Sequence, residues 1–263
     1  MDLGLQDRVA LITAASEGLG FACALRLANA GCKVALCARR EESLEKAKAA
    51  IVSVTKADVL AIKADLLKGE DLKALVQTVE ERFNRIDILV GNSGHIPYGS
   101  LFELSESDWY HAFDLLVMSM VRLTRRVIPL MRAQKKGNIV FLTSSVAKEP
   151  APHLLLSNVF RVGVVALAKS LSQRFAADNI RVNAVTLGYF DTGRVQKRVD
   201  DVVKQKGLSR KDAAREIAGD IPLGRIGTAE ECADLVAFLV SRRSEFLTGS
   251  TLQIDGGKSH GIF

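Results

Sequence analysis

Two hydroxyl groups and one cation stand in the middle of this chain at spacings that would let them act on one small molecule. Ser144 follows a strand-like run over 138–143, and Ser157 and Arg161 open a helix-like segment over 154–178. Residues four apart on a helix share a face. A serine hydroxyl can polarise a substrate oxygen, and an arginine holds its charge near neutral pH. A serine nucleophile is not expected, because no histidine stands at a fixed spacing to activate one.

Short apolar runs alternate with longer amphipathic segments along the chain. The strands and helices that these segments form must position Ser144, Ser157 and Arg161. The apolar runs are typical of buried strands, which we expect over 8–13, 33–37, 59–64, 86–91, 139–143, 181–186 and 251–254. Helices are expected between them, up to about 30 and over 39–55, 69–83, 109–133, 154–178 and 229–239. Strands alternating with helices form right-handed βαβ units. The sequence therefore predicts an α/β fold of Rossmann type, a doubly wound, mostly parallel seven-stranded sheet flanked by helices, as a single domain over 1–263.

One further segment, at about 191–221, is charged and helical in pattern. It stands between the end of a strand and the last elements of the sheet. Loops and short helices in that place often form mobile covers over a binding site. We expect a helical substrate lid here.

Composition argues against several classes of function. The net charge of +6 comes from basic residues scattered among acids, and a single tryptophan offers little surface for stacking bases, so nucleic acid is not expected. No run reaches the roughly 18 apolar residues of a membrane span, and the first residues do not have the pattern of a signal peptide. We expect no membrane association, no metal site and reduced core cysteines in a cytoplasmic protein; the cysteines are Cys23, Cys32, Cys37 and Cys232.

A glycine-containing turn joins the first expected strand to the first helix. In the segment 13–20, Gly18 and Gly20 would let the backbone approach a pyrophosphate, and the positive end of the following helix attracts its charge. Glycine pairs also occur in ordinary turns, but the strand before and the helix after favour a dinucleotide. Arg39 and Arg40 follow the second strand, where an arginine can pair with a 2′-phosphate. We expect NADP(H) rather than NAD(H). Glu17 nearby would repel that phosphate, and the alternative interpretation of the two arginines is a surface pair at the start of a helix.

These segments together resemble the short-chain dehydrogenase/reductase superfamily over essentially the whole chain. The turn over 13–20 is similar to its T-G-x-x-x-G-x-G motif, 91–94 to its N-N-A-G segment, and 181–185 with 187–188 to the strand that ends in P-G. The pattern is most similar to that of the 3-oxoacyl-acyl-carrier-protein reductases. The resemblance implies an oxidoreductase of a small carbonyl, alcohol or 3-oxoacyl substrate, assembled as a homotetramer or homodimer. It implies a cofactor site formed by Thr13, Ser16, Gly18, Leu19, Gly20, Arg39, Arg40, Asp65, Leu66, Asn92, Gly94, Gly188 and Thr192.

Most catalytic residues of that family are replaced in this chain, which makes it a divergent member with an atypical site. The family's Y-x-x-x-K motif aligns with Ser157 and Arg161, and its serine aligns with Ser144, or with Ser145 if the register shifts by one. Its asparagine aligns with Leu116, and the first glycine of its phosphate turn with Ala14. The resemblance implies that Ser144 polarises the substrate, Ser157 or a replacement handles the proton, and Arg161 holds the ribose.

Another residue would have to replace the missing tyrosine if the chain is catalytic. Tyr189, His95 and His153 are the candidates that the family fold would bring near the nicotinamide, and each has an ordinary packing or loop role as the alternative. Tyr98 lies in the same loop as His95, where anchoring of the loop is the simpler interpretation. An inactive dinucleotide-binding sensor or scaffold is the alternative function.

Overall fold

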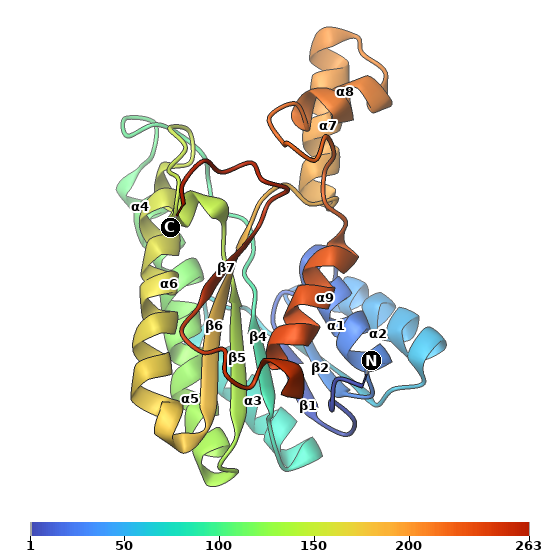
Figure 1. Cartoon of the computed structure of the whole chain (residues 1–263), viewed down its shortest axis with the longest axis vertical. Helices are drawn as coiled ribbons and strands as arrows, with labels where there is room; N and C mark the ends of the chain where they lie inside the picture. Colours follow the sequence, from blue (N-terminus) through green and yellow to red (C-terminus); the bar gives the residue numbers. More distant parts are fainter. Residues whose placement is uncertain (1, 263) are drawn as a thin grey trace.

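The computed structural model describes residues 2–262, which form a seven-stranded sheet with helices on both faces (Figure 1). All neighbouring strands are parallel, in the order β3-β2-β1-β4-β5-β6-β7. The strands are β1 (Val9–Ile12), β2 (Lys33–Ala38), β3 (Val59–Lys63), β4 (Ile88–Gly91), β5 (Gly137–Leu142), β6 (Ile180–Leu187) and β7 (Thr251–Ile254). This confirms the predicted fold, with every strand within two residues of its expected bounds.

The helices also follow the expected pattern, with one difference. They are α1 (Gly18–Asn29), α2 (Glu41–Thr55), α3 (Gly69–Phe83), α4 (Glu106–Phe113), α5 (Ser119–Ala133), α6 (Leu155–Phe175), α7 (Gly193–Lys206), α8 (Arg210–Ile217) and α9 (Ala229–Val240). The single helix expected over 109–133 is divided by a π-helical turn, η1 (Asp114–Met118). The Ser119 hydroxyl donates to the Leu115 carbonyl at 2.6 Å, which supports the wider turn. Such turns are frequent at functional sites.

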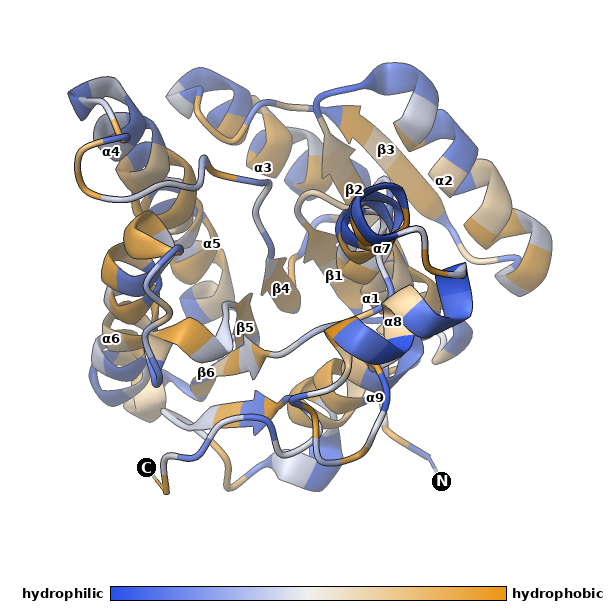
Figure 2. Cartoon of the chain, turned by 90° about the horizontal axis from the view of Figure 1, so that it is seen from above, coloured by the Kyte–Doolittle hydropathy of each residue, from blue (hydrophilic) through white to orange (hydrophobic). Residues whose placement is uncertain are grey.

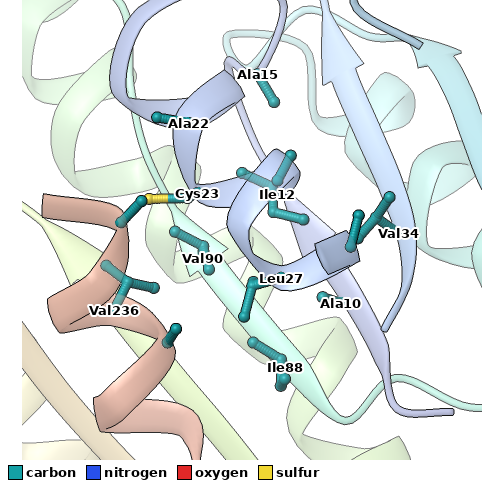
Figure 3. Close-up of a cluster of buried hydrophobic side chains, with 14 of the residues drawn as sticks. Ala10, Ile12, Ala15, Ala22, Cys23, Leu27, Val34, Ile88, Val90 and Val236 are labelled. Carbon is teal, nitrogen blue, oxygen red and sulfur yellow. The ribbon is translucent and has the colours of Figure 1, made fainter. Parts of the chain in front are cut away.

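The two faces of the sheet bury separate apolar cores. Successive side chains of a strand point to opposite faces, so Ala10 and Ile12 pack with α1, α2 and α9, while Val9 and Leu11 pack with α3, α5 and α6. Figure 3 shows the first core, with Cys23 of α1 between the strands and α9. All four cysteines are free and buried, in agreement with their expected role in the core.

The helices α7 and α8 project beyond the carboxyl ends of the strands (Figure 1). They have a small core of their own, formed by Val195, Val199, Ala213 and Ile217. Most residues of the two helices are hydrophilic (Figure 2). A parallel bridge between Phe190 and Gly227 ties the two ends of the segment together at its base. The predicted helical segment is therefore present as a distinct helical pair.

The helix α6 is long and has an extended apolar stretch. With its short continuation it covers Leu155–Asp178 and is long and apolar enough to cross a membrane by length and composition alone, although only 28% of its most apolar window is buried. It packs against β5, β6 and η1. Its place in the layer that covers the sheet is that of a core helix with one uncovered face.

Candidate active site

The turn after β1 is bonded to the end of β4. The Thr13 hydroxyl donates to the Asn92 carbonyl at 2.6 Å and accepts from the Asn92 backbone N–H at 2.8 Å. The Asn92 side-chain amide donates to the Ala14 carbonyl at 3.2 Å. These bonds hold the turn at the carboxyl edge of the sheet, between β1 and its neighbour β4, where open α/β sheets bind their ligands.

The geometry of this turn fits a phosphate group. Gly18 has φ +58°, and a Cβ on Gly20 would collide with the Ala14 carbonyl, so both positions need glycine. Ser16 and Leu19 are half-buried in the same turn. Glu17 precedes α1 without capping it through its side chain, which leaves the first backbone N–H groups of the helix available to an anion. Ala14 has φ +48°, an unfavourable value for a residue with a Cβ.

The two arginines after β2 have different surroundings. Arg40 forms an ion pair with Glu17, at 3.7 Å between Nη2 and Oε2. Arg39 is exposed and has no ion pair among residues 2–262. The acid that was expected to oppose a 2′-phosphate is therefore offset by Arg40, and Arg39 is the cation available to such a group.

The residues after β3, which the family resemblance assigns to the cofactor site, form a hydrogen-bonded turn. The Asp65 backbone N–H donates to the Asp71 carboxylate at 2.9 Å, and the Asp65 carboxylate accepts from the Leu67 N–H at 3.1 Å. Leu66 is buried. The Asp65 side chain thus has a structural task in this turn as well as its place at the sheet edge.

The helix α7 begins next to the turn over 13–20. Thr192 occupies the N-cap position of α7 but makes no capping hydrogen bond with its side chain. Its methyl carbon is 3.5 Å from the point where a Cβ on Gly18 would lie. Gly188, at the end of β6, lies so close to Asp255 that a Cβ would be 2.6 Å from that residue's Cβ. Thr192 therefore lies against the phosphate turn with its hydroxyl not used for capping.

The expected catalytic serines lie on two adjoining elements. Ser144 follows β5, and its hydroxyl accepts from the Val146 N–H at 3.4 Å. Ser157 is buried in the first turn of α6, and its hydroxyl has no hydrogen bond to any of residues 2–262. Asn158 fixes the connecting loop, because its amide exchanges bonds of 3.2 and 2.8 Å with the backbone of Ala151.

Arg161 lies one turn beyond Ser157 and is the least satisfied polar side chain of the site. Its Nε is shielded from solvent and has no hydrogen-bond partner within the described chain. Burial lowers the pKa of Arg161 to about 10, the charge of Arg194 acts in the same direction, and Tyr98 opposes both. The guanidinium stays charged at neutral pH. A charged group with an unused donor fits the hydroxyl or phosphate oxygens of a dinucleotide.

Leu116 places an apolar side chain where the family has its asparagine. It lies in η1, 2% exposed, and packs in the core of the sheet face that α6 covers. Gly94, in the loop after β4, lies near Leu115 of the same turn. Position 116, which aligns with the family's asparagine, is therefore an apolar core position.

The candidate replacement acids have unequal surroundings. The Tyr189 hydroxyl accepts from Arg198 at 2.8 Å, and its ring packs on the small core of α7 and α8. His153 is exposed and makes no hydrogen bond or ion pair within residues 2–262. The pKa of His95 is lowered, first by burial and then by the charge of Arg194. Tyr98 lies under Arg194, whose guanidinium is 4.8 Å from the ring centre. The position of Arg194 was not expected, because nothing in the sequence separates it from the other cations of the segment 191–221.

Comparison with known proteins decides the family. The family model for Enoyl-(Acyl carrier protein) reductase matches residues 13–259. The dehydrogenase/reductase SDR family member 4 of Bos taurus is 32% identical over 257 residues, covering 96% of this chain and 88% of the relative. The chain belongs to the short-chain dehydrogenase/reductase family. Among its relatives in this family is the 3-oxoacyl-[acyl-carrier-protein] reductase FabG of Staphylococcus epidermidis, 31% identical over 253 residues, 95% of this chain and 98% of the relative.

Solved structures of short-chain dehydrogenases/reductases overlay the whole fold. The L-sorbose reductase of Gluconobacter frateurii, complexed with NADPH and L-sorbose, has a TM-score of 0.97 and 32% identity over 100% of both chains. An NADPH-bound short chain oxidoreductase of Pseudomonas aeruginosa PAO1, described as containing an atypical catalytic center, has a TM-score of 0.89 and 29% identity over 98% of this chain and 100% of the other. The predicted family and fold are confirmed.

Proposed function

We propose that this chain is an NADPH-dependent reductase of a small carbonyl or 3-oxoacyl compound, or the corresponding dehydrogenase in the reverse direction. The observation that carries the proposal is the buried Nε of Arg161, which has no hydrogen-bond partner among residues 2–262 and lies one helical turn from Ser157 on α6. A buried unsatisfied donor costs free energy unless a ligand meets it. NADPH in two structurally similar proteins supports the same cofactor here.

The cofactor would lie along the carboxyl edge of the sheet. Its phosphates would meet the turn before α1, its 2′-phosphate would meet Arg39 with Arg40 beside it, and Thr192 would close over it from the lid. The proposed set is Thr13, Ser16, Gly18, Leu19, Gly20, Arg39, Arg40, Asp65, Leu66, Asn92, Gly94, Gly188 and Thr192. The glycine cradle and the uncapped start of α1 support this placement.

The bound cofactor supplies hydride chemistry, and the chain supplies orientation and electrostatics. Ser144, or Ser145 one residue on, would donate a hydrogen bond to the substrate oxygen. Arg161 would hold the ribose and stabilise negative charge that develops near it. Ser157 offers a second hydroxyl, but serine is a far weaker acid than a phenol of pKa about 10. Ser144, Ser157 and Arg161 thus form the proposed catalytic set.

The pair α7–α8 would act as the substrate lid. Its own small core and its narrow attachment at Phe190 and Gly227 support movement as a unit. The four buried free thiols are consistent with a reducing compartment, and we include a cytoplasmic location in the proposal.

We also propose self-assembly as a homodimer or homotetramer. Phe113 of α4 and Val159 and Val162 of α6 are 40–47% exposed on packed neighbouring helices. A second copy of this chain is the expected cover for such a face. Light scattering of the wild type and of Val162→Glu tests this, with Val54→Glu on α2 as the matched control. A monomeric wild type at micromolar concentration would refute it.

The decisive experiment for activity is a calorimetric titration with NADPH, NADP⁺, NADH and NAD⁺, followed by an absorbance assay at the nicotinamide band against a panel of carbonyls. Binding with turnover is the expected result. Binding without turnover across the panel would overturn the reductase and favour the sensor or scaffold, for which the loss of the polar side chain at Leu116 is the supporting feature. No binding of any nucleotide would overturn both.

A further inference from the structure

A carbonyl reduction needs a proton as well as a hydride, and the proposed set contains no strong donor. Resting on the proposed function, we infer that the proton comes from Tyr98, which lies outside the helix that carries Ser157 and Arg161. The family's tyrosine, which aligns with Ser157 on α6, would then be replaced by a tyrosine from the loop between β4 and α4.

The backbone holds this loop against the start of α6. Gly99, the residue after Tyr98, forms a parallel bridge with Leu154, which directly precedes α6. Ser157 and Arg161 lie on the first two turns of the same helix. The bridge therefore holds the loop that carries Tyr98 next to the start of the helix that carries Ser157 and Arg161.

Two cations face the Tyr98 side chain. The guanidinium of Arg194 lies 4.8 Å from its ring centre, and the phenol is close enough to Arg161 to raise the pKa of that residue against the effect of burial. Neither arginine has an ion pair with a carboxylate among residues 2–262. Tyr98 therefore borders cations from both α6 and α7.

The competing donors are less suited to the task. The Tyr189 hydroxyl accepts a hydrogen bond from Arg198 of α7, and its ring packs against the small core of α7 and α8, which ties this side chain to the helical pair. The pKa of His95 lies below its ordinary value, because burial and Arg194 disfavour the imidazolium, so this side chain carries little donatable charge at neutral pH. Tyr98 combines a hydroxyl that has no hydrogen-bond partner within the described chain with a place in the loop that is bridged to the residue before α6.

The step balances without a further reactant. Hydride adds to the carbonyl carbon, the π electron pair of the C=O bond moves to oxygen, and that oxygen takes the Tyr98 proton. The products are the alcohol, the oxidised cofactor and a phenolate. Tyr98 is 51% exposed, so water can return the proton directly. A buried chain of waters that carries the proton to solvent is then unnecessary, which accounts for the apolar side chain of Leu116.

The test compares three conservative variants of the holoenzyme, Tyr98→Phe, Tyr189→Phe and Tyr110→Phe. The last is the matched control, because Tyr110 is an exposed phenol on α4. Tyr98→Phe keeps the ring under Arg194 and removes only the hydroxyl. We expect kcat to fall about 10²-fold or more in Tyr98→Phe and to stay unchanged in the other two. NADPH binding, followed by nicotinamide fluorescence without turnover, is expected to stay unchanged in all three.

Three outcomes would overturn the inference. If the wild type reduces a carbonyl and Tyr98→Phe does so equally fast, Tyr98 is not the donor, while the proposed function stands. If Tyr98→Phe loses NADPH affinity in parallel with rate, the hydroxyl acts on cofactor binding instead. If the wild type binds NADPH and reduces nothing, the proposed function fails and the inference fails with it.

Discussion

The side chains of Glu17 and Arg40 form an ion pair between the phosphate turn and the start of α2, at 3.7 Å between Oε2 and Nη2. Both are largely exposed, so the pair adds little to stability. Its consequence is the distribution of charge along this edge of the sheet. Because Arg40 offsets the acid, Arg39 is left to attract a 2′-phosphate.

The first prediction concerns cofactor choice. Arg39→Asp is expected to weaken NADPH binding by about 10-fold or more, because it removes a charged hydrogen bond and adds repulsion, while NADH binding changes little. Calorimetry with both nucleotides measures this. Lys46→Glu, with the same change of charge further along α2, is the control. Equal losses for NADPH and NADH would show that Arg39 does not contact the phosphate.

A second prediction concerns the strained residue in the phosphate turn. Ala14 has φ +48°, and relief of a left-handed alanine is worth about 1–2 kcal/mol, from which the greater freedom of unfolded glycine subtracts about 0.5–1 kcal/mol. Ala14→Gly is therefore expected to raise the free energy of unfolding by up to about 1 kcal/mol without weakening NADPH binding. Urea denaturation provides the measurement, with Ala49→Gly in exposed helix α2, which should destabilise, as the control. A less stable Ala14→Gly would mean that the alanine is not strained.

The third prediction is that Glu231, at the start of α9, makes a contribution to stability that depends on pH. A hydrogen bond from Arg225 and one from the Thr228 backbone lower the pKa of Glu231 to about 2. A depressed pKa adds stability above the unfolded value of about 4.5 and loses it as pH falls towards the folded value. Glu231→Gln is thus expected to lower the melting temperature at neutral pH, by an amount that shrinks below about pH 4. If Glu231→Gln lowers the melting temperature by the same amount at every pH, the lowered pKa of Glu231 is not the cause.

The fourth prediction concerns the lid. Val199 is buried in the small core of α7 and α8, and Val199→Ser should loosen that pair while the sheet stays folded. Limited proteolysis is expected to cut within 191–221 faster than in the wild type, with an unchanged unfolding midpoint of the rest. Lys204→Ser, exposed on the same helix, is the control. Uniform loss of stability would show instead that the pair folds together with the sheet.

The sequence was sufficient where structure depends on neighbouring residues. The strands and the turn over 13–20 are contiguous patterns, and the structure reproduces them. The π turn at Asp114–Met118 was missed, because the apolar spacing on its two sides merges into one helical pattern. The approach of Arg194 to Tyr98 could not be predicted, because it depends on how the lid packs over a loop far away in the chain.

The separate core of α7 and α8 has a consequence for how proteins of this architecture diverge. A helical pair that does not share its packing with the sheet can change its surface, or even its length, without disturbing the strands below. Substitutions that alter what is admitted to the site and substitutions that alter what is bound at the sheet edge then accumulate in different parts of the gene. A lineage can lose its ancestral proton donor and still retain its nucleotide while a new donor is selected.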